Sequence, residues 1–404
     1  MSDSDPNSSW SDPSAADTGS TDSVTETTHT SWFARLGKAL MGALIGLGMV
    51  GGSCALLYWN EGRAVIAIRA LDDGLHRVIP AKPDAIDPAL DGKLVHVAAQ
   101  LGAQTTARDP QFELRGPVAI RLRRTVEMYQ WKEEEHTTTE RTTGGGETKR
   151  KTYSYSREWS ESPISSGNFR VPGGHQNPTM SLRTQTFNSP DARLGPYKLD
   201  QEVLGHVTHF QPIPARAVSS MPAGFQAQGD ILYRGADIAS PQIGDLRVKL
   251  AGIPPEAYSV VAAQRQGTLA PDPGRAGYTI ALAHAGTVSA EQMFQEQKDQ
   301  EKLMTWIWRG VGFVVMLLGF TMFFAPLSVL VGFLPFLESI VGAGLFFIAL
   351  MLAIPLTLVV IAISWLVVRP LIGGGLLVAA LVALVLMIRR NRNRAAMIGQ
   401  PRMA

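Results

Sequence analysis

The chain has 404 residues, with 37 Lys and Arg against 35 Asp and Glu, and one cysteine, Cys54. A single cysteine excludes an intramolecular disulfide, so the core alone must hold the fold together. The near-zero net charge and the lack of a large basic patch argue against nucleic acid as a partner.

Residues 1–32 are rich in Ser, Thr, Asp and Pro and poor in apolar side chains. Such a segment buries too little surface to offset its chain entropy. We therefore expect a disordered acidic N-terminal tail.

Residues 39–59 form an uncharged run that is long enough to cross a bilayer as a helix. A signal peptide is the alternative, but the acidic tail before it and the length of the run favour an uncleaved anchor. Gly42 with Gly46, and Gly48 with Gly52, have the spacing that allows a second helix to approach closely. Glycine is also common in membrane helices for other reasons.

Residues 60–303 have an ordinary polar composition, with short alternating apolar runs separated by Gly and Pro turns, which predict a β-rich domain. The Glu-, Thr- and Lys-rich segment 132–151 surrounds a glycine triplet, and we interpret it as an exposed hairpin. Ser289 and Gln292 have the spacing of a capping box, which predicts the start of a helix that leads back to the membrane.

The last hundred residues are strongly apolar, and Glu338 is the only charged side chain between Gly310 and Val368. We expect further spans at 306–326, 340–368 and 371–388, followed by a basic cytoplasmic tail at 389–404. The fold class is therefore an α+β integral membrane protein with four transmembrane helices and a large β-rich extracytoplasmic domain between the first and second.

Basic residues flank both ends of this arrangement. Arg35 and Lys38 precede the first span, and four arginines follow the fourth. The positive-inside rule places both termini in the cytoplasm, which requires an even number of spans. The domain must then lie on the other side, in a periplasm or an organelle lumen.

No strong catalytic or metal-binding pattern is present. His206 and His209 are separated by two residues. On a strand their rings would point to opposite faces and would not converge on one metal. The spans hold no ionisable residue away from their ends, which argues against a transporter. We therefore expect no catalytic residue, metal or cofactor.

Several motifs in order resemble the LUMA family, also called transmembrane protein 43, over residues 33–390. The motifs are Asn60-Glu61-Gly62-Arg63-Ala64, Gly92 to Val97, Val126-Glu127-Met128-Tyr129-Gln130-Trp131, Tyr153 to Ser156 with Glu158-Trp159, Gly174-His175-Gln176-Asn177-Pro178, Gly244 to Val248 around Asp245, and Arg369-Pro370. The resemblance implies the four-span layout, self-association and a role in membrane organisation. Animal members are proteins of the endoplasmic reticulum and inner nuclear membrane that bind emerin and lamins. The Ala- and Arg-rich composition here favours a bacterial inner membrane and a periplasmic domain.

The favoured function is a non-enzymatic, self-associating scaffold or sensor of membrane organisation or stress, with lipid and possible other membrane proteins as partners. An oligomeric ion channel is the alternative, and a lipid- or envelope-processing enzyme using His175, His206 or His209 is a third. We interpret Asn60, Glu61, Gly62 and Arg63 as the junction between domain and membrane. The motif residues Trp131, Trp159, His175, Asn177, Asp245, Arg369 and Pro370 are interpreted as mainly structural.

Overall fold

The structure is a computed structural model that describes residues 23–115, 119–274 and 277–368. Arg369, Pro370, the predicted fourth span 371–388 and the basic tail 389–404 lie outside the described residues. Residues 1–22 of the predicted acidic tail lie outside them as well.

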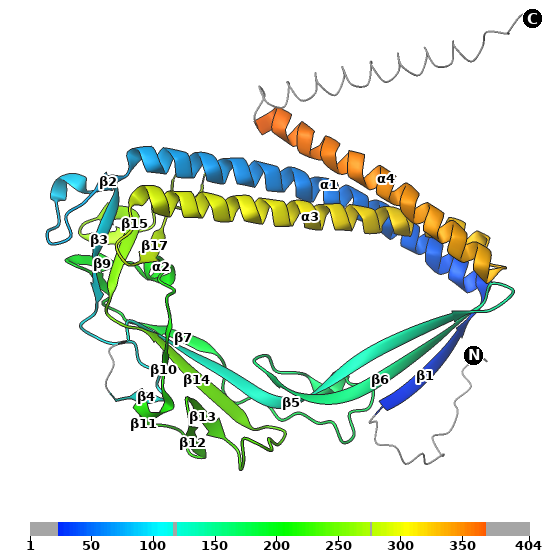
Figure 1. The fold of residues 1–404 in the computed structure, drawn as a ribbon, viewed down its shortest axis with the longest axis horizontal. Coiled ribbons are helices and arrows are strands. Elements are labelled where there is room, and N and C mark those ends of the chain that lie inside the picture. The colour runs from blue at the N-terminus through cyan, green and yellow to red at the C-terminus, as the bar shows by residue number, and fades with distance from the viewer. Residues whose placement is uncertain (1–22, 116–118, 275–276, 369–404) are drawn as a thin grey trace, which may run out of the picture.

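Three long helices run side by side along one edge of the molecule (Figure 1). They are α1 (Trp32–Arg77), α3 (Ala290–Leu330) and α4 (Pro335–Val368), and a short helix α2 (Gln201–Gly205) lies in the β-rich part. Within the described residues, these three are long and apolar enough to cross a membrane, which agrees with the first three predicted spans. The structure therefore supports the first three of the four predicted spans.

The first helix does not end where the predicted domain begins at residue 60. It continues to Arg77, because its apolar stripe remains packed on α3 beyond the uncharged run. Ala64, Ala67 and Leu71 are buried along this stripe. At Gly74 an added Cβ would lie 2.7 Å from Cδ1 of Ile280 and 2.9 Å from the Phe294 ring, so a larger residue would require these side chains to shift.

The return helix begins as expected, since the Ser289 side chain accepts a hydrogen bond from the Gln292 backbone N–H at 3.3 Å. Its end differs from the prediction. It continues through Pro326 to Leu330, and α4 starts at Pro335 instead of residue 340. Proline is well suited to the first position of a helix, where its missing N–H would have no helical partner. The connector is therefore only residues 331–334.

The β-rich part contains two main sheets among the described residues. The larger sheet has the strand order β1-β6-β5-β14-β13-β12, with β7 also paired to β5 and β10 to β14. Its strands are β1 (Ser23–Thr30), β5 (Arg121–Arg141), β6 (Glu147–Ser160), β7 (Gln185–Asn188), β10 (Gln211–Ile213), β12 (Phe225–Gln228), β13 (Ile231–Arg234) and β14 (Leu246–Ile253).

The second sheet has the order β17-β15-β16-β9-β8-β3-β2, with β15 also paired to β3. Its strands are β2 (Ile79–Pro80), β3 (Leu94–Gly102), β8 (Arg193–Leu194), β9 (Tyr197–Leu199), β15 (Ala257–Arg265), β16 (Thr268–Ala270) and β17 (Leu282–Ala285). A small pair joins β4 (Glu113–Leu114) to β11 (Val218–Ser220). The predicted β-rich domain is thus confirmed.

The β-rich part is joined to the helices by a shared apolar core. Leu71 of α1 and Phe294 of α3 pack with Leu94, Val261 and Ile280 of the β-rich part. Because both helices enter this core without a break, the domain and the apolar helical segments form one continuous unit.

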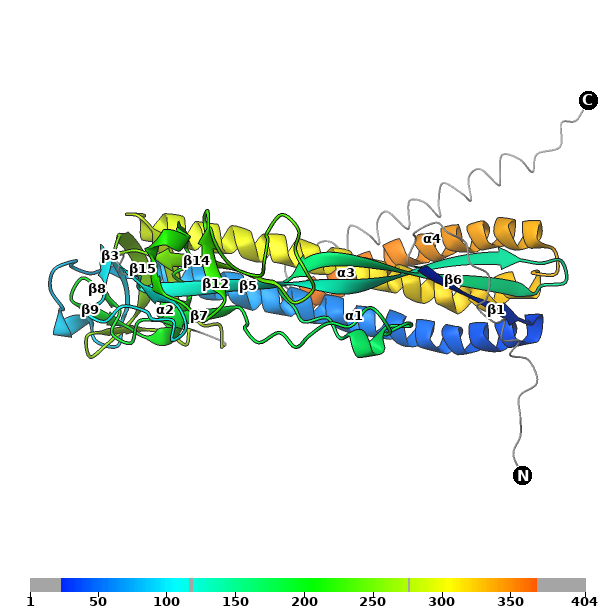
Figure 2. The same ribbon diagram turned by 90° about the horizontal axis from the view of Figure 1, so that it is seen from below.

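A long ribbon of three strands leaves the domain and runs in the same direction as the helices (Figures 1 and 2). It consists of the far part of β5, β6 and the edge strand β1. The predicted hairpin at 132–151 is confirmed, with β5 paired to β6 from Met128↔Ser160 to Arg141↔Glu147.

The disordered tail prediction is wrong for residues 23–30, which pair with β6 from Ser23↔Ser154 to Thr30↔Glu147. Thr and Val favour strands, and the open edge of β6 offers unpaired backbone groups. The acidic Glu26 of this strand also forms an ion pair with Arg170.

Candidate functional site

A polar contact that joins all three long helices lies where the apolar segments meet the domain. The Glu61 carboxylate accepts hydrogen bonds from Nε and Nη2 of Arg309 at 2.6 and 2.8 Å. It also accepts one from the indole Nε1 of Trp365 at 2.7 Å. Glu61 is 2% exposed. One buried carboxylate therefore ties α1 to both α3 and α4.

The neighbouring junction residues also face α3. Asn60 is fully buried and donates from Nδ2 to the Thr305 carbonyl oxygen at 3.2 Å. Arg63 Nη1 donates to Glu301 at 2.7 Å. Gly62 has open space around it. Asn60 and Arg63 thus join α1 to α3, and Glu61 joins α1 to both α3 and α4.

A tyrosine of the domain extends this network. Tyr278 donates to the second oxygen of Glu301 at 3.2 Å, beside the Arg63 contact. Burial, and then the nearby Glu301 carboxylate, raise the pKa of Tyr278 to about 12, so the phenol keeps its proton and remains a donor. The network therefore continues from the helices into the domain.

Tryptophans surround this junction at one level of the bundle. Trp59 and Trp308 meet edge to face at 6.4 Å between ring centroids. The Arg309 guanidinium lies 4.7 Å from the Trp306 ring centroid and 5.7 Å from that of Trp365. Such a girdle, with a basic residue inside it, is typical of the membrane–water interface.

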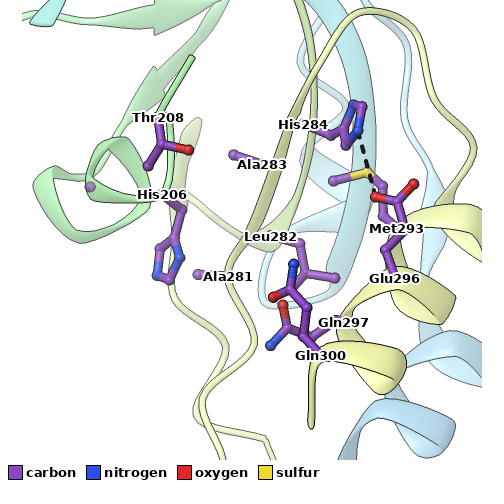
Figure 3. Close-up of a pocket in the computed structure, with 11 residues that line it drawn as sticks. His206, Thr208, Ala281, Leu282, Ala283, His284, Met293, Glu296, Gln297 and Gln300 are labelled. Carbon is purple, nitrogen blue, oxygen red and sulfur yellow. Dashed lines mark ion pairs between the residues drawn. The ribbon is translucent and has the colours of Figure 1, made fainter. Parts of the chain in front are cut away.

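Two pockets lie near the junction. The smaller, of about 140 Å³, is lined by Glu61, Arg309 and Trp365 together with Ala64, Val65, Ile68, Lys302, Thr305 and Trp306. The larger, of about 290 Å³, lies between α3 and the domain (Figure 3).

Of the histidines named in the enzyme alternative, His206 lines the larger pocket. His206 and Thr208 lie on one side of it, while His284 is paired with Glu296 at 3.5 Å on the other (Figure 3). His209 instead contacts Glu256 at 3.0 Å. The three histidines of that alternative are therefore not brought together, and within the described residues no group of three His, Cys, Asp or Glu could hold a metal.

The motif residues Trp131, His175 and Asn177 meet where the ribbon leaves the domain. Asn177 Oδ1 accepts from the Trp131 N–H at 2.7 Å, and its Nδ2 donates to the Trp131 carbonyl at 2.9 Å. The His175 ring stacks on Tyr155 at 3.8 Å and meets Trp131 edge to face at 4.8 Å. This cluster fixes the base of the ribbon and supports a structural role.

Trp159 and Asp245 lie in a second structural cluster. The Asp245 carboxylate accepts from the Tyr233 hydroxyl at 2.5 Å and from the Gln242 N–H at 2.8 Å. The Trp159 ring lies under the Arg247 guanidinium at 4.5 Å. The contacts of Asp245 are those of a turn, which agrees with the structural interpretation.

An unexpected polar cluster holds the tip of the ribbon against the opposite end of the helices. Arg35 bonds Glu338 at 2.5 Å, Glu147 at 3.3 Å and the Gly145 carbonyl oxygen at 2.6 Å. Arg35 and Glu338 are 7% and 2% exposed. From the sequence alone, Arg35 indicates only topology. The signal that could have revealed its partner is Glu338, a single carboxylate in an apolar region.

The chain is similar to known proteins over most of its length. A sequence profile described as transmembrane protein 43 matches residues 128–370. Transmembrane protein 43 of Rattus norvegicus is 32% identical over 375 residues, covering 90% of this chain and 93% of that protein. The Homo sapiens protein is 32% identical over 89% of this chain and 92% of its own length, and the Drosophila melanogaster homolog is 30% identical over 80% and 88%. No solved structure matches the chain.

Proposed function

The chain belongs to the transmembrane protein 43 family, and we propose that it is a non-enzymatic membrane scaffold that works as an assembly of several copies. The observation that carries this proposal is the position of the ribbon tip. The domain packs on α1 at Leu71, whereas the tip binds the same helix at Arg35. The apolar residues 39–59 lie between these two contacts.

A bilayer crossed by α1, α3 and α4 would contain this apolar stretch, and a docked ribbon would have to run through the same thickness. Residues 132–141 of β5 and 147–153 of β6 are dense in Glu, Lys, Arg and Thr. Such side chains and an open strand edge are not tolerated against hydrocarbon. The ribbon must therefore be enclosed by protein or water.

Several copies provide that enclosure when their ribbons face inward and their helices face outward. The helices carry exposed apolar side chains suited to lipid, including Leu44 at 67% and Phe347 at 62% exposure. In this arrangement the apolar faces meet the acyl chains, and the ribbons contact one another or enclosed water. Self-association then follows from the need to shield the polar strands.

The Glu61–Arg309 junction would couple the domain of each copy to its membrane helices. Because α1 and α3 continue from the apolar segments into the domain core, a displacement of the domain is transmitted to the helices. This coupling supports a role in organising the membrane or sensing its state. We place both termini and the ribbon tip in the cytoplasm and the bulk of the domain on the opposite side, following the charges that flank the spans.

The inward-facing ribbons also favour the oligomeric ion channel as a second candidate. Polar strands around a common axis would line a water-filled passage. Purified protein in planar bilayers would conduct ions on this alternative. Absence of current across voltages and lipid compositions would leave the scaffold as the better account.

The test combines a mass measurement with a cross-link. In a Cys54→Ala background, Gly144→Cys and Phe333→Cys place thiols on residues whose backbones are joined by a 3.0 Å hydrogen bond from the Gly144 N–H. We expect oxidation in native membranes to join these two cysteines within one chain. Native mass spectrometry of the same sample in lipid nanodiscs should give a defined oligomer.

A matched control pairs Gly144→Cys with Phe347→Cys, which lies farther along α4 and faces outward. That pair should not cross-link within a chain. A monomer in which Gly144→Cys and Phe333→Cys still cross-link would contradict the proposal, because a docked ribbon would then be tolerated without other copies.

A further inference from the structure

We propose that the smaller junction pocket binds the phosphate of an anionic phospholipid, with Lys302 and Arg309 as its ligands. The proposal goes beyond the scaffold by naming a lipid partner, and it rests on that function only for placing α1, α3 and α4 in a membrane. The pocket lies within one copy of the chain, so it does not depend on the oligomer.

The pocket is built by matching stripes on two helices. Glu61, Ala64, Val65 and Ile68 follow the i, i+3, i+4, i+7 pattern on α1, and Lys302, Thr305, Trp306 and Arg309 follow it on α3. Residues at this spacing share one helix face. Trp365 of α4 completes the lining.

The cationic groups that line this pocket are not fully used by protein contacts. Arg309 bonds Glu61 through Nε and Nη2, and among the described residues its Nη1 has no hydrogen-bond acceptor. Within the part of the chain that the structure describes, Lys302 pairs only with Asp299 at 2.8 Å, and both side chains are 59% exposed. A solvent-exposed pair of this kind contributes little and leaves the ammonium free to bind another anion.

The carboxylate in the pocket does not oppose an anion. Both oxygens of Glu61 are occupied by Arg309, and one of them also accepts from Trp365. The three charged side chains that line the pocket, Glu61, Lys302 and Arg309, therefore sum to one positive charge. Guanidinium and ammonium groups form their strongest hydrogen bonds with phosphate and carboxylate oxygens.

The surroundings favour a lipid over a soluble phosphate. The pocket is at the tryptophan level, where phospholipid headgroups lie. On the membrane side of Arg309, α3 exposes further apolar side chains: Val311 at 40%, Val314 at 50% and Leu318 at 49%. A phosphate at Arg309 would thus place acyl chains along an apolar surface.

The test measures lipid retained by the full-length protein. Protein in nanodiscs containing equal amounts of phosphatidylglycerol and phosphatidylcholine is released in the mass spectrometer, and bound lipid is counted per chain. We expect wild-type protein to retain phosphatidylglycerol selectively. Lys302→Gln should reduce retention about tenfold, the change expected for one charge-assisted hydrogen bond.

A second variant, Arg309→Lys, preserves a cation for Glu61 but removes the additional guanidinium donor, and it should also lose selectivity. The control is Lys298→Gln, which removes the same charge one turn away, at a lysine bound to Asp72 at 2.5 Å. The control should retain lipid as wild type does. Thermal unfolding of each variant verifies that the fold is intact.

Three results would overturn the proposal. Equal retention of the two lipids would show no preference for an anionic phosphate group. Equal loss in Lys298→Gln would show general surface attraction. Displacement of phosphatidylglycerol by inorganic phosphate would assign the pocket to a soluble ligand. None of these outcomes depends on whether the protein is an oligomer, so failure here is distinguishable from failure of the scaffold.

Discussion

Gly46 of α1 and Gly319 of α3 approach so closely that a Cβ added at Gly46 would lie 2.5 Å from the Gly319 carbonyl oxygen. Gly48 and Gly52, which have the same spacing as the Gly42 and Gly46 pair, have open space around them. One predicted glycine pair is therefore involved in packing within the chain, while the other lies on an open face.

This difference predicts that the same substitution at Gly46 and at Gly48 will change the stability of the protein by different amounts. Gly46→Val should separate α1 from α3 and lower the free energy of unfolding by about 1–3 kcal/mol, the usual cost of overpacking. Gly48→Val on the same helix should have little effect. Thermal unfolding in detergent measures both, and equal losses would show that glycine matters here only for helix flexibility.

Replacing Glu61 should reveal a buried charge at the junction. Glu61→Leu leaves Arg309 without its carboxylate and should cost about 3–5 kcal/mol. The double variant Glu61→Leu with Arg309→Met removes both charges and should be more stable than the single variant. A double variant no better than Glu61→Leu would contradict a coupled ion pair.

Arg35 should control docking of the ribbon tip. Arg35→Gln leaves Glu338 buried without its closest cation, so the cross-link between Gly144→Cys and Phe333→Cys should fall by roughly tenfold or more. Lys38→Gln removes the same charge three residues later, from an exposed position. An unchanged cross-link in Arg35→Gln would show that the backbone and aromatic contacts hold the tip without the ions.

Asn177 should stabilise the base of the ribbon through its amide. Asn177→Ala removes the partner of both backbone groups of Trp131 and should cost about 1–3 kcal/mol. Asn177→Asp keeps the acceptor but loses the donor to the Trp131 carbonyl, so it should be destabilising too. Asn168→Ala, at an exposed position, provides the control in the same unfolding measurement.

His96 should make stability depend on pH below neutrality. Burial lowers the pKa of His96 from its ordinary 6.5, and its Nε2 lies 2.9 Å from the Val288 carbonyl oxygen. As pH falls through about 6.5, the unfolded chain takes up this proton before the folded chain does. The contribution of neutral His96 to the free energy of unfolding is therefore complete above pH 6.5. It is lost as the pH falls through the lower pKa that His96 has in the folded chain.

Thermal unfolding between about pH 8 and pH 5 checks this sign. His96→Gln should flatten the decline below pH 6.5, whereas His136→Gln, at an exposed histidine of β5, should not. A slope that persists unchanged in His96→Gln would assign the pH dependence to other groups.

Much of the fold followed from local patterns. The apolar runs, the cap formed by Ser289 and the hairpin at 132–151 each depend on residues close together in sequence. The extension of α1 to Arg77 did not follow from a local pattern. Ala64 and Leu71 favour a helix there only because they pack against α3. The strand at 23–30 likewise required the edge of β6 as a partner.

The sequence by itself determined which segments are apolar enough for a membrane and that the rest is β-rich, because run length and alternation are local properties of the chain. Only the tertiary structure decided which charges are paired. Glu61 meets Arg309 across 248 residues, and Arg35 meets Glu338 across 303. Such contacts depend on how the helices and the ribbon are placed in space, and no spacing in the sequence encodes that placement.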